Sequence, residues 1–465
     1  MASSRPALLR QLGVVSATAL VVSNMIGTGI FTTTGFAAGD LGSPSLILWI
    51  WVVGAVCAFL GAICYSELGV NLPSSGGEYV YLTQAFGPTW GFITGWVSFF
   101  AGFSAPIAAA ALAFAGYVGY FYPSVSPQNA RVLAGSGDWT LQLGGAQILA
   151  CALVAVFTAL NVVGLQRAAR VQNILTVVKI AVLVAFIALA FTAGHGDSAN
   201  FSQNAVRTSS TPLVGQFAIS LFWIYVAYSG WNAATYVAEE VRHPARTLPV
   251  ALAIGTGIVA VLYLLLNVVF IYASPLELMK GKLAVGSFAA SRLFGPDIAG
   301  IFSALMALSL MATVNAMVTI GPRVYYAMAK NGAFLASAAE VHPQWHTPVA
   351  AIVAQGICTM IMTLTPFPQL VIYIGFTLNF FAVMSVVALC LMRRRKGWRK
   401  LRVVSFCYPL FPALFILVGC WMIFYGVQMK PVISLAAVIT VLTGAAVYHL
   451  RLKSHAPKAP IVETY

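Results

Sequence analysis

Three places in the 465-residue chain put groups suited to ligand binding inside long apolar runs. Gly27, Thr28 and Gly29 interrupt the first such run, and residues 228–232 (Tyr-Ser-Gly-Trp-Asn) interrupt another about two hundred residues later. The third place is a lone cation, Lys179. Glycine weakens a helix by about 1 kcal/mol relative to alanine, so the first two places favour broken helices. The N–H groups at the start of a helix attract anions, and this is the chemistry that the first break could supply.

The composition shows what kind of molecule surrounds these places. Apolar residues make up 60% of the chain and charged residues only 8%, whereas an ordinary globular domain is about 25% charged. A soluble protein with so little charge could not cover its own surface. The composition therefore excludes a soluble enzyme, a disordered regulator and a DNA-binding module, and it predicts an all-α membrane protein that crosses the bilayer many times.

Twelve apolar runs reach the roughly 20 residues that a helix needs to cross the hydrocarbon core. They lie at 12–38, 45–71, 85–120, 142–164, 171–193, 213–238, 247–273, 297–329, 348–365, 368–392, 403–427 and 432–450.

The basic residues predict the orientation of these runs, because cytoplasmic loops carry an excess of Lys and Arg. With the N-terminus inside, 18 of the 25 fall on the cytoplasmic side, 6 fall outside and Lys179 falls within a run. Both termini are therefore predicted to be cytoplasmic, with 451–465 as a solvated tail. Residues 393–396 are interpreted as an anchor at the anionic leaflet. The cytoplasmic set is Arg5, Arg10, Arg167, Arg170, Arg242, Arg246, Arg323, Lys330, seven residues from Arg393 to Arg402, Arg451, Lys453 and Lys458.

The two interruptions support each other. Gly27 and Gly29 alone are better explained by close packing between helices. Interrupted spans at corresponding places in two halves, however, are typical of transporters built from inverted repeats. We therefore predict a first repeat at 12–193 and a second at 213–392, followed by two further spans at 403–450. Five spans per repeat is an odd number, so the two halves insert with opposite topology.

Two further features have a structural and a functional interpretation. A cation near the middle of a span costs roughly 2.5–3.5 kcal/mol, and Lys179 has no acid within a helical turn. Its side chain could reach the membrane interface, or its ammonium group could cap carbonyls of a broken helix in place of a metal ion. The second interpretation makes transport independent of sodium. Tyr263 and Asn267 share a helix face and could line a site or bond between helices.

Motifs for other chemistry are missing from the sequence. The seven cysteines form no CxxC pair and are expected to be free thiols. The histidines are scattered, and no metal-ligand cluster, nucleophile–base pattern, Walker loop or haem motif occurs. We therefore expect no metal, no cofactor and no enzymatic activity.

Five stretches, all between the first and ninth runs, resemble the amino acid–polyamine–organocation (APC) superfamily of transporters. The resemblance is closest to the prokaryotic type of the L-type amino acid transporter branch. It implies a LeuT-like fold of 5+5 inverted repeats plus two C-terminal helices. The matching stretches are 26–31, 65–69 with 73–81 and 85–88, 172–179, 227–232 with 239–249, and 323–332 with 347–348.

The same resemblance implies a site for the two charged ends of an amino acid. Amides around Gly27, Thr28 and Gly29 would bind the α-carboxylate. Carbonyls of the two breaks would receive the α-ammonium group, and Lys179 would stand where sodium-coupled relatives hold an ion. The carbonyl positions are Met25 or Ile26 in the first break and Val226, Ala227 and Ser229, next to Gly230, in the second. The family's aromatic gate falls on Val226, so Tyr225 or Trp231 would have to substitute for it, with Asn232 and Tyr263 as further pocket residues.

The resemblance implies a sodium-independent exchanger of neutral L-amino acids that works by alternating access in the plasma membrane, here a bacterial inner membrane. Its partners are the amino-acid substrate and the bilayer, and no nucleic acid. Residues 121–141 contain no cysteine, so we expect no disulfide-linked heavy chain. One alternative is a proton-coupled carrier of cationic amino acids or polyamines, which needs an acid lining the cavity. None of the eleven acids lies clearly at the middle of a span, and Glu67, Glu239 and Glu240 are at cytoplasmic ends. Another is an amino-acid sensor derived from a transporter.

Overall fold

The computed structural model describes residues 12–73, 76–136, 139–163, 165–330, 334–345 and 347–452. The end of the predicted tail, 453–465, lies outside these ranges. So do four residues of the predicted cytoplasmic set, Arg5, Arg10, Lys453 and Lys458.

Helices occupy all twelve predicted runs, which confirms the all-α membrane fold. Nine helical segments of the described chain are long and apolar enough to cross a membrane. A bent pair, α1 (Val14–Met25) and α2 (Gly29–Leu41), adds a tenth, and two shorter apolar segments lie at Val178–Thr192 in α8 (Leu165–Thr192) and in α14 (Val349–Met362). The nine segments are α3 (Pro44–Asn71), α5–η1–α6 (Pro88–Val97, Ser98–Ser104, Ala105–Val118), α7 (Gly145–Val163), α9 with most of η5 (Leu213–Tyr228, Ala233–Glu240), α10 (Pro244–Ala273), α13 (Pro296–Lys330), α15 (Phe367–Met392), α17 (Leu410–Met429) and α18 with η7 (Pro431–Val447, Tyr448–Leu452).

Short elements connect these spans. A two-stranded antiparallel hairpin lies between α6 and α7, and the connection from α10 to α13 folds into two helices. The short elements are α4 (Glu78–Phe86), η2 (Pro123–Val125), η3 (Pro127–Asn129), β1 (Arg131–Ser136), β2 (Trp139–Leu143), η4 (Ser198–Ser202), α11 (Leu276–Met279), α12 (Val285–Phe294), η6 (Ala336–Ala339) and α16 (Arg402–Ser405).

One predicted loop is helical instead. Arg167 and Arg170 were expected between two runs, but α8 already begins at Leu165. The stretch 165–170 (Leu-Gln-Arg-Ala-Ala-Arg) contains no Gly or Pro and consists of strong helix formers, so the helix continues beyond the apolar run.

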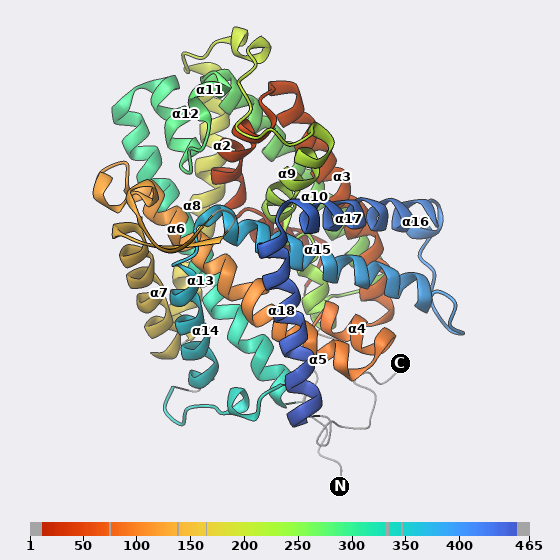
Figure 1. Ribbon diagram of the computed structural model, residues 1–465. Coiled ribbons are helices and arrows are strands. Elements are labelled where there is room, and N and C mark those ends of the chain that lie inside the picture. Colours follow the sequence, from red (N-terminus) through yellow and green to blue (C-terminus); the bar gives the residue numbers. More distant parts are fainter. Residues whose placement is uncertain are drawn as a thin grey trace.

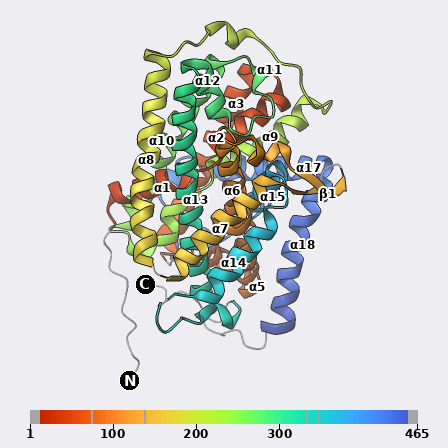
Figure 2. The ribbon, with the colours of Figure 1, turned by 90° about the vertical axis from the view of Figure 1, so that its left-hand side faces the viewer.

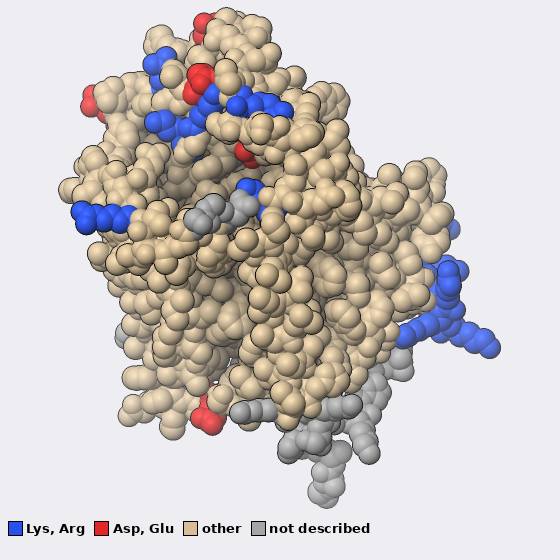
Figure 3. All heavy atoms as spheres, viewed as in Figure 1, with Lys and Arg blue, Asp and Glu red and all other residues tan. Residues whose placement is uncertain are grey.

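The spans form a bundle around the two interrupted helices. α10 packs against α1 and α3, α2 packs against α9, and α13 packs against α6 and α8. At one end of the bundle, α11 and α12 cover α2 (Figures 1 and 2). In the face shown in Figure 3 most of the surface is uncharged, and charged residues lie mainly near its upper end and at its edges. Large apolar side chains such as Leu417 on α17 and Leu442 on α18 are exposed, as expected for surfaces that contact lipid.

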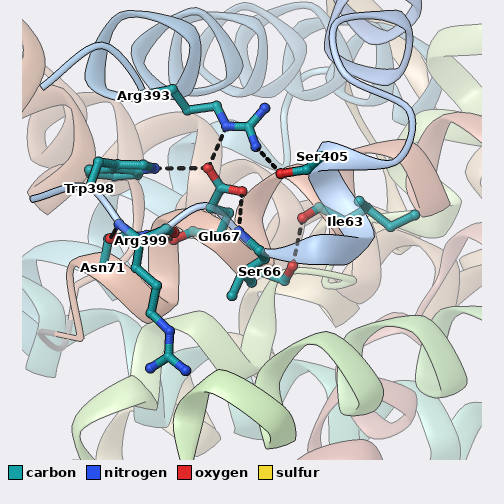
Figure 4. A network of polar contacts seen from close by, with 9 residues as sticks. Ile63, Ser66, Glu67, Asn71, Arg393, Trp398, Arg399 and Ser405 are labelled. Carbon is teal, nitrogen blue, oxygen red and sulfur yellow. Dashed lines mark hydrogen bonds and ion pairs between the residues drawn. The ribbon is translucent and has the colours of Figure 1, made fainter.

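A buried ion pair fastens the connection between α15 and α17 to the end of α3 (Figure 4). Glu67 of α3 is fully buried, and the guanidinium of Arg393 lies 2.7 Å from its carboxylate. The indole of Trp398 and the amide of Leu401 also donate to Glu67, at 2.8 and 3.0 Å. Arg393 in turn donates to Ser405 at 2.7 Å. Arg393, predicted to anchor at the leaflet, is therefore buried and paired, whereas Arg394 beside it is exposed.

We expect Arg393→Ala to destabilise the protein by about 3–5 kcal/mol, because it leaves the Glu67 carboxylate buried without a counter-charge. The measurement is the thermal unfolding midpoint in detergent, with Arg394→Ala as the matched control. The control should unfold close to wild type. Equal midpoints for the two variants would show that the pair does not hold this end of the bundle.

Candidate functional site

The first break interrupts the span formed by α1 and α2. α1 ends at Met25, α2 begins at Gly29, and the two helices are bent by 44°. Ile26 leaves helical geometry with ψ of 90°. In this stretch of the described chain, the amides of Thr28 and Gly29 donate no hydrogen bond to a backbone carbonyl, as is usual for the first amides of a helix. The predicted break is present, and it directs these two N–H groups away from the helix ladder.

The second break lies at the end of α9. The helix stops at Tyr228, Ser229 is extended with ψ of 146°, and the chain resumes as the 3₁₀ helix η5. Gly230 has φ of 100°, a conformation that residues with a side chain rarely adopt. Glycine is therefore required at this turn.

The two breaks are in contact with each other. A Cβ atom added to Gly29 would collide with the backbone of Ala227, and one added to Gly230 would lie 2.8 Å from the Asn24 carbonyl. Glycine thus serves both interpretations of the sequence: it permits the breaks, and it lets the two backbones approach closely. Gly27, Thr28, Ser229 and Gly230 remain half-buried.

Two side chains from neighbouring helices bind the carbonyls that the breaks expose. The hydroxyl of Tyr263 lies 2.7 Å from the Met25 carbonyl and 3.2 Å from the Ala227 carbonyl, so it joins the two breaks. The ammonium group of Lys179 donates to the carbonyl of Ile26, and the side chain is only 3% exposed. The ammonium group therefore lies inside the bundle at the first break and not at the membrane interface.

The predicted ammonium acceptors are already partly engaged. Val226 accepts both the amide of Ser229 at 3.1 Å and its hydroxyl at 2.7 Å. A carbonyl oxygen accepts two hydrogen bonds, so Val226 is filled. Ile26 accepts from Lys179, and Met25 and Ala227 share the single O–H of Tyr263, so each of these three carbonyls keeps a lone pair for a ligand.

The other predicted pocket residues either pack against apolar side chains or form hydrogen bonds between helices. The indole of Trp231 is buried, edge-on to Tyr65 at 4.7 Å between centroids and near Phe415 at 6.3 Å. Trp231 thus wedges η5 against α3 and α17. Tyr225 is half-buried, with its hydroxyl 3.5 Å from the Leu378 carbonyl. Asn267 takes the interhelical alternative, since its amide oxygen accepts from Thr34 at 2.7 Å.

Glu78 is a polar site residue that the sequence reasoning missed. It begins α4, outside the spans, yet its Oε1 accepts from Tyr65 at 2.9 Å and from Asn232, in the second break, at 3.2 Å. Burial raises the pKa of Glu78 to about 7, even though these hydrogen bonds and one from Tyr236 lower it. The signal available in the sequence was an acid directly after two glycines, in a stretch that folds back against the bundle.

A mainly helical protein with many spans, in which two broken helices meet inside the bundle, has the architecture of a secondary transporter. The chain belongs to the Amino acid permease family, whose model matches residues 12–446. It is 30% identical to the human Large neutral amino acids transporter small subunit 2, over 97% of this chain and 82% of that protein. Mouse relatives at 29% identity are the Asc-type amino acid transporter 1 (97% of this chain, 82% of the relative) and the b(0,+)-type amino acid transporter 1 (95% and 88%). These matches confirm the APC resemblance and identify an amino-acid transporter, not an enzyme.

The contact between the breaks can be tested with Gly230→Ala. A methyl group would strain the positive φ and approach the Asn24 carbonyl, so we expect little folded protein and at least a tenfold loss of amino-acid uptake. Gly257→Ala on α10 is the matched control, because a Cβ at Gly257 meets nothing within 4 Å. Wild-type uptake by Gly230→Ala would mean that the breaks do not need this contact.

Proposed function

We propose that this chain is a sodium-independent exchanger of neutral L-amino acids that works by alternating access. The observation that carries the proposal is the Lys179 ammonium group bound to the Ile26 carbonyl at the first break. A tethered cation at that position supplies the positive charge that a metal ion would otherwise bring. The names of the relatives, which include a transporter of large neutral amino acids, support the substrate class.

The geometry suits a zwitterion. The amides of Thr28 and Gly29, at the positive end of α2, would receive the α-carboxylate. The free lone pairs of the Met25, Ile26 and Ala227 carbonyls would receive the α-ammonium group. The charged ends of the substrate would thus bind backbone amides and carbonyl lone pairs that the broken helices leave unused.

The orientation and the organisation of the chain belong to the same proposal. The excess of Lys and Arg on one side supports cytoplasmic termini in a bacterial inner membrane. Broken helices at corresponding places support two inverted repeats at 12–193 and 213–392. The seven cysteines are free thiols and 121–141 contains none, which supports function without a disulfide-linked heavy chain.

One observation favours a second candidate, a proton-coupled carrier of cationic amino acids or polyamines. Such a carrier needs an acid beside the substrate path, and Glu78 bonds to Asn232 of the second break. The two candidates differ in net flux. A proton gradient across liposomes without internal amino acid would drive L-arginine uptake by the carrier, whereas an exchanger would give none.

Sodium independence predicts equal exchange in sodium and choline buffers. Proteoliposomes loaded with unlabelled L-leucine should take up labelled L-leucine at the same rate in both. Empty liposomes, without protein, correct for leakage. A strict sodium requirement would refute the coupling proposal, and binding of L-leucine without counterflow would identify a sensor.

Lys179→Ala should lower the exchange rate at least tenfold while expression stays near wild type. The variant leaves the Ile26 carbonyl buried without its donor, and an unsatisfied buried polar group costs about 1–3 kcal/mol. Lys396→Ala, at an exposed position after α15, is the matched control and should exchange normally. An unaffected rate in Lys179→Ala would assign the lysine no part in the cycle.

A further inference from the structure

Glu78 is held in place by the turn that precedes α4. Gly77 has φ of 51°, and a Cβ at this residue would lie 2.6 Å from the ring of Tyr236. The turn therefore lies directly against η5. Glu78, the first residue of α4, points its carboxylate toward α3 and the second break, where Tyr65 and Asn232 donate to it.

The donors to Glu78 come from parts of the chain that are far apart in sequence. Tyr65 belongs to α3, Asn232 to the second break and Tyr236 to η5. Asn232 also donates to the Tyr236 hydroxyl at 3.3 Å, so the cluster is connected. One carboxylate thus ties η5 to both α3 and α4.

All of these donors are neutral, and this separates Glu78 from the buried carboxylate of Glu67. Glu67 has the guanidinium of Arg393 as a counter-charge. Among the described groups, no cation contributes to the pKa of Glu78. In the connection that follows α15, Arg393 pairs with Glu67, and Arg395 donates to the Gln84 carbonyl of α4. The other titratable groups that face this region are Tyr65 and Glu67 on α3, Tyr79 and Tyr81 on α4, Tyr225 on α9 and Tyr236 on η5.

The part of the chain that Glu78 restrains includes α1 as well as η5. The amide of Leu12 donates to the Glu240 carbonyl at 2.9 Å, and the Leu12 carbonyl accepts from the amide of Arg242 at 2.9 Å. This pairing joins the segment before α1 to the end of η5. The inner halves of the two broken helices, α1 and η5, are therefore connected. The carboxylate of Glu78 restrains both of them.

We propose that Glu78 is a proton-binding site that controls the inner halves of the two broken helices. Taking up a proton from cytoplasmic water neutralises the carboxylate and weakens its hold on Tyr65, Asn232 and Tyr236, because charge-assisted hydrogen bonds are stronger than neutral ones. The proton returns to water when the carboxylate ionises again. The role in the cycle rests on the proposed exchange function, whereas the proton site itself stands on the geometry of the cluster.

The direction of the effect follows from the charge of Glu78. With a pKa of about 7, the carboxylate is mostly neutral at about pH 6 and mostly ionised at about pH 8. Exchange requires the inner halves to move, so it should be roughly fivefold faster at the lower pH, in line with the difference between neutral and charged hydrogen bonds.

The proton site is tested first without transport. Infrared difference spectra of the purified full-length protein between about pH 6 and about pH 8 should show a protonated-carboxyl band that titrates with a midpoint near 7. The band should disappear in Glu78→Gln and persist in Glu277→Gln, which alters an exposed carboxylate paired with Lys280. A band that Glu78→Gln leaves unchanged overturns the proposal.

L-leucine exchange in proteoliposomes at the same two pH values tests the role in the cycle. Glu78→Gln, permanently neutral, should exchange at both pH values within about twofold of the wild-type rate at low pH. Glu277→Gln should keep the wild-type pH profile. A pH profile in Glu78→Gln like that of wild type overturns the role of Glu78. Wild type that shows no exchange at both pH values, but still shows the infrared titration, would instead refute the exchange function. The proton site would remain supported.

Discussion

A helix that breaks inside a bilayer exposes backbone groups that hydrocarbon cannot solvate, and the architecture of this transporter depends on how they find partners. Each break borrows donors from a neighbouring helix: Tyr263 of α10 bridges Met25 and Ala227, and Lys179 of α8 binds Ile26. The second break also satisfies itself, because Ser229 turns its hydroxyl back to Val226. The spans around the breaks therefore stabilise them, because they supply hydrogen bonds to the exposed carbonyls.

The choice of lysine as one of these donors affects energetics as well as structure. A bound metal ion can leave and carry its gradient into the transport cycle, but an ammonium group on α8 stays with the protein. With a lysine side chain bound at the first break, the cycle needs a driving force other than the release of a metal ion from that place. Counter-transport of a second amino acid meets that requirement, because the gradient of one substrate then drives the movement of the other.

The sequence was sufficient for the spans, the breaks and Lys179, because long apolar runs, helix-weakening glycines and a lone intramembrane cation all leave local signals. It could not predict contacts that form only when a connection between spans folds back against the bundle. Glu78 lies in a connection between spans, and it becomes half-buried only because α4 packs against α3 and η5. Arg393 was one of several consecutive basic residues, and its pairing with Glu67 joins positions more than three hundred residues apart. Trp231, a candidate gate by type, turned out to be packed against Tyr65 because its direction is set by the non-helical turn at Gly230.

Hydrogen bonds restrain both ends of the broken helices. On the outer half, Tyr117 donates to the Phe31 carbonyl at 2.8 Å and the amide of Gly281 donates to the Gly35 carbonyl at 2.9 Å. These bonds are neutral, but a carboxylate also joins the outer halves, because Asp40 near the end of α2 accepts from the hydroxyl of Ser220 on α9 at 3.0 Å. On the inner half, the corresponding contact runs through the carboxylate of Glu78. The second broken helix is therefore held by a carboxylate on each side of its break, Asp40 through Ser220 and Glu78 through Asn232.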